Sequence, residues 1–178
     1  MIKIINSLKL RIANRTSDGR VEYLRNKGCK IGKKTRLLCT IASFGTEPYL
    51  VEVGEDCLFS GNVSLFTHDG GVKVLNSLNY FDGKKMDKVG KIKIGNNCFI
   101  GAYSKILPGV TIGDNVIVGT GAIVTKDVPS NSVVAGVPAR IICTIDEYYE
   151  KNKENFYPTL EMGFEEKKRV LTELFNEE

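Results

Sequence analysis

The chain has very little of the chemistry that metal sites and disulfide frameworks require. Its 178 residues include one histidine and five cysteines. No two cysteines are spaced as a C-x-x-C pair, so zinc-site spacing is missing and we expect no metal. Cys57 and Cys98 fall at small-residue positions of a repeat described below. We therefore expect them to be buried thiols that pack as small hydrophobic residues.

Long apolar runs are also missing. No stretch is long enough to span a bilayer, so we expect no integral membrane segment. The N-terminus has neither the apolar stretch nor the cleavage site of a secretory signal. From these absences we expect a cytoplasmic protein, and its length suits one domain with a substantial core.

The formal charge of +4 hides an asymmetry between the two ends of the chain. Residues 1–40 carry eleven Lys or Arg against Asp18 and Glu22, whereas residues 146–178 carry ten Asp or Glu against five Lys or Arg. A basic end could attract nucleic acid, anionic lipid or a phosphorylated substrate. Because no basic motif with interleaved aromatic residues accompanies this excess, we favour a solvated charged face and expect no nucleic-acid partner.

What the sequence does contain is a six-residue period. One aliphatic residue recurs at this spacing, and small or β-branched residues stand four positions after each: Ile94, Ile100, Ile106, Ile112, Val118 and Val124, with Cys98, Ser104, Val110, Val116, Ala122 and Val128. A period of six is neither the 3.6 of a helix nor the 2 of an ordinary strand. It indicates a repeated short strand and corner, which predicts an all-β solenoid, a parallel β-helix.

Three units would make one coil, so residues 18 apart should stack. This predicts three aliphatic columns: Ile94 on Ile112, Ile100 on Val118, and Ile106 on Val124. The repeat begins at Ile31 and is interrupted at residues 42–49 and again at 69–91. Long loops without a period of their own are usually functional, which directs attention to these two segments.

Both ends of the chain have helical patterns. Residues 2–27 are predicted as helix, with Met1, Ile5, Leu8 and Ile12 on one face and a break at residues 17–19. We favour a cap on the open end of the solenoid, which such folds need, over the alternative of a basic amphipathic helix lying on a membrane. An apolar stripe from Phe164 to Phe175 predicts a C-terminal helix.

These patterns divide the chain into three predicted parts. They are an N-terminal helical cap (1–28), a β-helix domain with an inserted loop (29–142, loop 69–91) and a C-terminal helical tail (143–178).

Two short segments extend the repeat: Val124-Thr125-Lys126-Asp127-Val128-Pro129 and Ala135-Gly136-Val137-Pro138-Ala139-Arg140. Together with the repeat they resemble the hexapeptide-repeat acyltransferases, over about residues 29–142. The resemblance implies a left-handed parallel β-helix with triangular coils, a homotrimer, and acetyl-CoA as acyl donor. The whole layout is similar to acetyltransferases of capsule, O-antigen and exopolysaccharide clusters, through residues 23–25, 44–49, 67–71 and 165–168.

His68 stands where the repeat gives way to the second loop. Acetyl transfer to a hydroxyl needs a base near pH 7, and imidazole titrates in that range. A lone histidine is more often structural, but His68 matches the family's catalytic histidine, so the resemblance implies a general base. Asp69, Glu47, Glu52 or a backbone carbonyl could orient it, and the sequence leaves these open.

The resemblance also implies contacts with acetyl-CoA. Ala102 and Thr120, each after a repeat glycine, would meet the pantetheine arm, with Thr125 and Lys126 further along. Arg140 would meet phosphate near the adenine end, and Phe99 would lie near the acyl group. Cys143 replaces a second arginine that some sugar acetyltransferases carry. In the family the site lies between subunits, so His68 of one chain would share it with contacts made across the interface.

The segment after His68 should surround the acceptor. We expect Asp69, Asn76, Tyr80 and Lys84 to bind a saccharide there, and the excess of lysines hints at an anionic acceptor, unless they only keep the loop soluble. The sequence thus predicts an acetyl-CoA-dependent O-acetyltransferase acting on a sugar hydroxyl of a surface polysaccharide or its precursor. The alternatives are an N-acetyltransferase for a nucleotide-linked amino sugar and a non-catalytic β-helix scaffold.

Overall fold

The computed structural model describes residues 2–176, without the side chains of residues 2–7. It contains two compact units, which meet in the chain between Ile145 and Asp146. Among the helices of the described residues, none is both long enough and apolar enough to cross a membrane.

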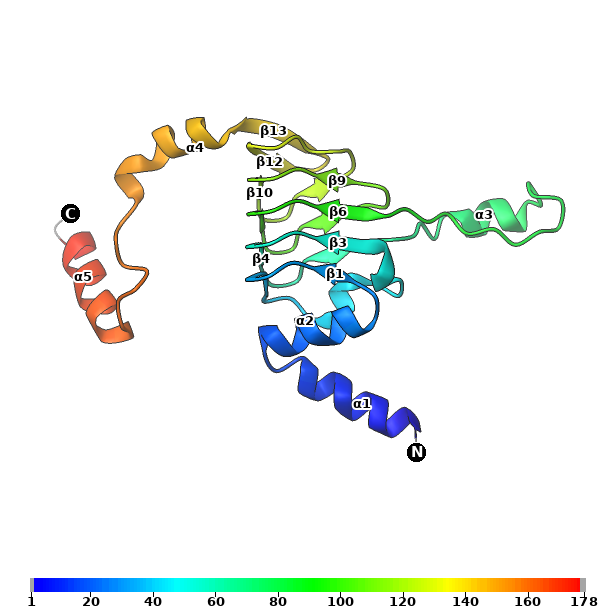
Figure 1. Ribbon diagram of the computed structural model, residues 1–178. Helices are drawn as coiled ribbons and strands as arrows, with labels where there is room; N and C mark the ends of the chain where they lie inside the picture. The colour runs from blue at the N-terminus through cyan, green and yellow to red at the C-terminus, as the bar shows by residue number, and fades with distance from the viewer. Residues whose placement is uncertain (1, 177–178) are drawn as a thin grey trace. The chain divides into compact units, whose positions relative to one another are not determined.

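The first unit is a solenoid of short strands in three sheets (Figure 1). Sheet A contains β1 (Lys30–Ile31), β3 (Val51–Val53), β6 (Ile92–Ile94) and β9 (Thr111–Ile112). Sheet B contains β2 (Arg36–Leu37), β4 (Leu58–Phe59), β7 (Phe99–Ile100), β10 (Ile117–Val118), β12 (Ser132–Gly136) and β13 (Ala139–Thr144). Sheet C contains β5 (Ser64–Leu65), β8 (Lys105–Ile106) and β11 (Ile123–Val124). From β3 to β11 the chain visits A, B and C in turn, whereas β2 is followed directly by β3 and β11 by β12 of sheet B. All pairings between these strands except β12–β13 are parallel.

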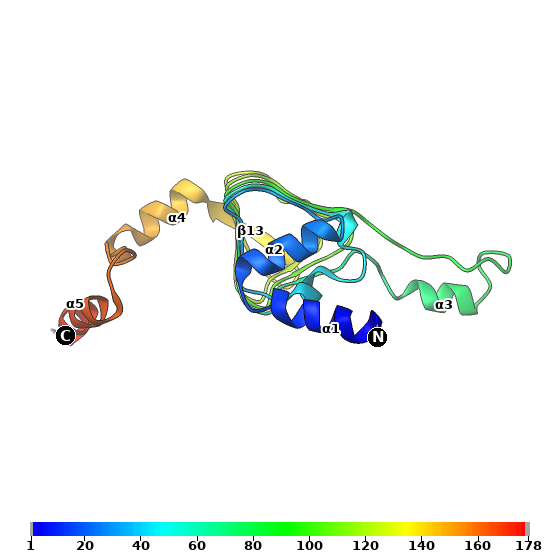
Figure 2. The same cartoon turned by 60° about the horizontal axis from the view of Figure 1, so that its bottom comes forward.

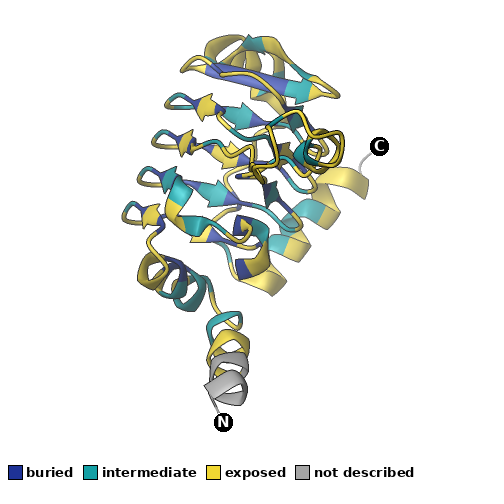
Figure 3. Ribbon diagram, turned by 90° about the vertical axis from the view of Figure 1, so that its right-hand side faces the viewer, coloured by how far each residue is buried: buried dark blue, intermediate teal, exposed yellow. Residues whose placement is uncertain are grey.

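The three predicted columns are confirmed. Ile94 pairs with Ile112, Ile100 with Val118 and Ile106 with Val124. All six side chains are at most 4% exposed, and the small residue four positions after each is buried as well. Alternation of these buried positions with exposed ones is visible along the strands in Figure 3. The six-residue period therefore records one inward side chain per strand and one per corner.

The corners between sheets A and B explain the glycines and asparagines of the repeat. A Cβ built on Gly95 would lie 2.5 Å from Asp114 Oδ1 and 2.7 Å from the carbonyl carbon of Gly113, so only glycine fits under the next coil. Asn97, Asn115 and Asn131 stand one above another with φ of 52–59°, a region that asparagine tolerates well. Their amides form a ladder, with Nδ2 of Asn97 donating to Asn115 (2.9 Å) and Nδ2 of Asn115 donating to Asn131 (2.8 Å).

Two helices precede the first coil, α1 (Ile2–Ala13) and α2 (Ser17–Asn26). The predicted break at residues 17–19 is wrong, because those residues form the first turn of α2. The hydroxyl of Thr16 accepts a hydrogen bond from the Gly19 amide (3.0 Å), which starts the new helix there. Of the predicted apolar face, Leu8 and Ile12 are described, whereas Met1 and the side chain of Ile5 lie outside the described residues.

α2 lies across the first coil (Figure 2). Its side chains form hydrogen bonds with backbone groups of that coil. Ser17 Oγ accepts from the Leu37 amide (2.9 Å), and Arg20 Nε donates to the Leu37 carbonyl (2.9 Å). Arg25 donates to the carbonyls of Ile31 (2.6 and 3.0 Å) and Gly32 (3.0 Å). Part of the basic excess near the N-terminus is therefore used to cap an open edge, where backbone groups would otherwise lack partners.

The two interruptions have defined structures. The first contains the 3₁₀ turns η1 (Ile41–Phe44) and η2 (Pro48–Leu50). The second, which we call the arm (residues 69–91), leaves the solenoid and carries a short helix that the sequence did not predict, α3 (Val72–Ser77) (Figure 1). At the far end of the stack, β12 and β13 form an antiparallel hairpin that was not predicted either.

The second unit contains α4, which begins at the unit boundary (Ile145–Asn152), η3 (Lys153–Asn155) and α5 (Phe164–Asn176). The helix expected from Phe164 to Phe175 is confirmed by α5. α4 was not predicted, because its sequence IDEYYEKN is polar and short.

Candidate active site

His68 lies just after β5, at the corner where the chain would turn from sheet C to sheet A. It forms an isolated antiparallel bridge with Val89. On either side of it, the Asp69 amide donates to the Lys88 carbonyl and the Gly90 amide donates to the Thr67 carbonyl, both at 2.8 Å. The two ends of the arm are thus tied together at His68, which fixes its backbone.

The imidazole is held by a carboxylate. His68 Nδ1 lies 2.9 Å from Glu47 Oε2, which also accepts from Thr67 Oγ1 (2.6 Å), and Glu47 Oε1 accepts from Thr46 Oγ1 (2.7 Å). With Nδ1–H donated to Glu47, Nε2 retains the lone pair that can take a proton. The His68 side chain is 47% exposed, so a substrate can reach it.

The pKa shifts of Glu47 and His68 suit a role of His68 as a general base. The hydrogen bonds from Thr46, Thr67 and His68, in that order, lower the pKa of Glu47 to about 2. The hydrogen bond to Glu47 and then the charge of Glu47 raise the pKa of His68 above its ordinary value, with smaller contributions from Asp87 and Asp69. Glu47 therefore stays ionised, and it makes His68 a stronger base than free imidazole.

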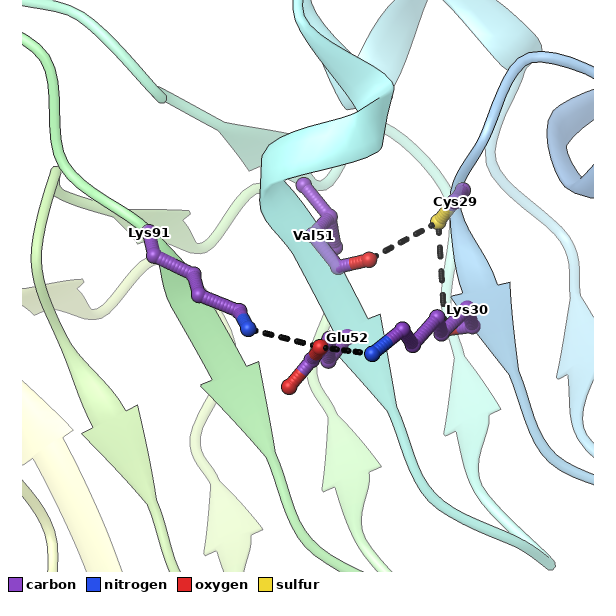
Figure 4. A network of polar contacts seen from close by, with 5 residues as sticks. All are labelled: Cys29, Lys30, Val51, Glu52 and Lys91. Carbon is purple, nitrogen blue, oxygen red and sulfur yellow. Dashed lines mark hydrogen bonds and ion pairs between the residues drawn. The ribbon is translucent and has the colours of Figure 1, made fainter.

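The structure decides among the orienting residues that the sequence left open. Asp69 does not hold the imidazole; it accepts from Lys88 Nζ (2.8 Å) and the Gly71 amide (2.9 Å). Glu52 lies on sheet A between Lys30 (2.7 Å) and Lys91 (2.6 Å), as Figure 4 shows. Glu47 is the partner because the first interruption brings it beside the corner from which the second one leaves.

The residues expected at acetyl-CoA lie on different edges of one chain. Ala102 and Thr120 stand at the corner between sheets B and C, where the Ala102 carbonyl accepts from the Gly121 amide (2.8 Å). Thr125 and Lys126 follow β11 at the corner between C and A. That is the corner of His68, but two coils further along, roughly 10 Å at the usual strand spacing.

The other two candidates lie on sheet B, the side of the solenoid opposite that corner. Phe99 is 37% exposed on β7 and lines a shallow pocket of about 290 Å³ with Leu58 and Ile117. Arg140 is on β13, and its Nη1 donates to the Ala139 carbonyl (2.9 Å). Within one chain, neither residue is brought to His68.

The arm contains the residues expected at the acceptor. The side chain of Asn76 links two segments of the arm, because its Nδ2 donates to the Met86 carbonyl (2.8 Å) and its Oδ1 accepts from the Met86 amide (2.9 Å). Tyr80 is 70% exposed, and Lys84 is exposed as well. Only Asp69, of the four, adjoins His68.

Sequence reasoning missed a pocket of about 510 Å³ in the arm, lined by Asp69, Val72, Leu75, Phe81, Met86 and Asp87, among others. The signal that could have revealed it is a set of apolar residues spaced through an otherwise polar loop.

The predicted burial of Cys57 and Cys98 is confirmed, at 1% and 2% exposure. Their thiols donate to the carbonyls of Gly95 and Gly113, respectively, both at 3.1 Å. In the part of the chain that the structure describes, no three His, Cys, Asp or Glu side chains are grouped as metal ligands.

Comparison with known proteins identifies the family. Residues 91–126 match the bacterial transferase hexapeptide (six repeats). Protein CapG of Staphylococcus aureus is 42% identical over 96% of this chain and 95% of its own length. The galactoside O-acetyltransferase of Escherichia coli strain K12 is 40% identical over 60% of this chain and 52% of its own length. A solved galactoside acetyltransferase in complex with coenzyme A matches with a TM-score of 0.61 and 27% identity, covering 83% of this chain and 82% of the other.

The chain therefore belongs to the hexapeptide-repeat transferase family. It is an enzyme of the acetyltransferase class, and family membership implies the left-handed form of the parallel β-helix.

Proposed function

We propose that the protein is an acetyl-CoA-dependent O-acetyltransferase that acetylates a sugar hydroxyl of a surface polysaccharide or its precursor. The observation that carries the proposal is the His68–Glu47 pair, a half-exposed imidazole with one nitrogen held by a carboxylate. The similarity to the galactoside O-acetyltransferase of Escherichia coli supports a sugar acceptor, and the solved galactoside acetyltransferase in complex with coenzyme A supports the donor. The use of acetyl-CoA agrees with the cytoplasmic location expected from the sequence.

In the proposed reaction, Nε2 of His68 takes the proton of the acceptor hydroxyl as its oxygen attacks the acetyl carbonyl. The donor supplies an acetyl group as a thioester, whose carbon–sulfur bond breaks as the new carbon–oxygen ester bond forms. The proton on His68 then passes to the departing thiolate, which restores the neutral imidazole. Glu47 keeps the proton of Nδ1 in place and stabilises the imidazolium. General-base help of this kind contributes about 10²–10⁴-fold.

The separation of the candidate residues favours a site shared between subunits. In one chain His68 lies at one edge of sheet C, whereas Ala102 and Thr120 lie at the other. A closed cyclic trimer would bring opposite edges of neighbouring chains together. We therefore propose a homotrimer in which His68 of one subunit works with Ala102 and Thr120 across the interface. Lys126, which we also expect at this shared site, lies at the corner of His68 in its own chain.

The cofactor-binding residues offer suitable chemistry. Lys126 and Arg140 are cations for phosphate groups, and Arg140 has a planar fork of donors. At the corner of Thr120, the neighbouring Gly121 has φ of 71° and open space where a Cβ would be. A ligand chain could approach the backbone closely there.

The deciding test is His68→Ala, assayed with acetyl-CoA and hydroxyl or amino sugars while free thiol is followed. The variant should fold, bind coenzyme A and lose turnover with hydroxyl sugars by at least about 10²-fold. Turnover like that of the wild type would refute the role of His68. Acetylation of amino sugars alone would replace the proposal by N-acetylation, and an intact trimer that binds no coenzyme A would point to a scaffold.

A further inference from the structure

α1 is joined to the first coil mainly through α2. It packs against α2, which in turn packs against β1 and β2. Leu10 lines a pocket with Tyr23 and Ile41, and Ala13 packs against the core. These residues define the side of α1 that faces protein.

The other side of α1 is apolar and uncovered in the chain. Leu8 and Ile12 are one helical turn apart, so they share a face. They are 58% and 55% exposed, respectively. An exposed apolar helix face of this kind needs a partner surface, and the charged residues around it indicate the chemistry of that surface.

The charged side chains that α1 and the turn after it place around this face are all positive. Lys9, Arg11 and Arg15 are exposed, and the sequence has no acidic residue before Asp18. On α2, by contrast, Arg20 and Arg25 are bound to carbonyls of the first coil. Lys9 and Arg11 of α1, and Arg15 in the turn after it, therefore remain available to an anionic surface.

A cleft of about 430 Å³ adjoins the same face, between α1 and α2. Lys9 and Arg15 line it together with Ile12 and the Tyr23 ring, and Glu22 is its one acidic residue. Two cations beside an apolar floor suit a phosphate headgroup with the first methylene groups of its lipid.

We propose that α1 docks on the surface of an anionic bilayer. Leu8 and Ile12 enter the boundary between headgroups and acyl chains, while Lys9, Arg11 and Arg15 contact lipid phosphates. A second copy of α1 is a poorer partner, because two such faces would bring like charges together. One short helix binds weakly and reversibly, and the proposed trimer would present three.

The test is sedimentation of the full-length protein with vesicles of phosphatidylcholine, alone or mixed with phosphatidylglycerol. The wild type should sediment with the mixed vesicles only, and less so as salt rises. Lys9→Glu/Arg11→Glu should weaken binding by at least about tenfold, and Leu8→Glu/Ile12→Glu should weaken it as well. Leu160→Glu is the matched control, since this leucine of the second unit is 92% exposed and should not matter.

Two results would overturn the proposal. One is equal sedimentation of the wild type with both kinds of vesicle, or with neither. The other is a change in molar mass by light scattering in Leu8→Glu/Ile12→Glu, which would make this face an interface between copies. Acetylation of a soluble acceptor should be unaffected in every α1 variant, so a failure here is distinguishable from a failure of the proposed reaction.

Discussion

The regular coils (residues 92–128) and the interrupted ones (residues 39–91) are built on the same repeat but differ at one corner. In the regular coils the chain turns from sheet C to sheet A at residues 107–109 without any insertion. In the two preceding coils it departs at that same corner, first through η2 and then through the arm, before returning at β3 and β6. Because these departures are stacked, Glu47 from one meets His68 from the other. The buried core of the coils thus follows the six-residue repeat. The candidate catalytic pair forms where insertions interrupt that repeat in two consecutive coils.

The largest effect that we predict is on the stability of the regular coils. Ile100 is fully buried between Phe59 and Val118. Ile100→Ala should lower the free energy of unfolding by about 2–5 kcal/mol, because it removes buried methyl groups and leaves a cavity. Urea denaturation measures this, and turnover per folded molecule should stay near that of the wild type. A loss below about 1 kcal/mol would show that the core of the coils is not close-packed.

Glu47→Gln tests the candidate catalytic pair of the interrupted coils. The amide keeps the shape of the carboxylate but removes the charge that holds and stabilises the imidazolium. We expect kcat/KM to fall by about ten- to hundredfold, a part of what general-base catalysis contributes. Stability at pH 7 should change far less than in Ile100→Ala.

The pH profile of Glu47→Gln tests whether Glu47 acts on the pKa of His68 or only supports the local structure. Glu47 raises the pKa of His68, and the base must be unprotonated to act, so activity in the wild type rises as pH passes that pKa. Removing the negative charge lowers the pKa of His68, and the acidic limb of kcat/KM should move to lower pH. Glu52→Gln is the control, because Glu52 is also ion-paired but lies on sheet A. An unmoved limb in Glu47→Gln would contradict electrostatic coupling.

Much of the regular region could be predicted from the sequence, whereas little of the interrupted region could. Ile94, Ile100 and Ile106 each point into the core from a position that recurs in every coil. Their stacking partners, 18 residues later, could therefore be predicted from the spacing alone. Glu47 and His68 are 21 residues apart with no shared period, and three carboxylates were chemically equivalent candidates. The helix in the arm and the antiparallel β12–β13 pairing were missed because each is local to a break in the repeat. The arm pocket was missed because it depends on side chains meeting across a loop.

A smaller effect concerns the asparagine ladder of the regular coils. Asn115 has φ of 55° and exchanges amide hydrogen bonds with Asn97 and Asn131. Asn115→Ala should cost about 1–2 kcal/mol of unfolding free energy, since it removes exposed hydrogen bonds and places alanine in the left-handed region. Asn115→Gly should cost less because glycine accepts this φ. Equal losses in the two variants would assign the effect to the ladder alone, and thermal unfolding can compare them.

The smallest effect concerns the charge of the arm. Lys88 is paired with Asp69 at 2.8 Å, whereas Lys73, Lys84 and Lys85 are exposed further out. If these lysines attract an anionic acceptor, its KM should rise about two- to fivefold from low to physiological salt, because the screening length falls from about 30 to 8 Å. Lys84→Ala/Lys85→Ala should flatten the profile, and Lys153→Ala, which removes an exposed lysine paired with Glu150, should leave it unchanged. A wild-type KM that is independent of salt would mean that these lysines serve solubility, and that the arm recognises its acceptor through uncharged contacts.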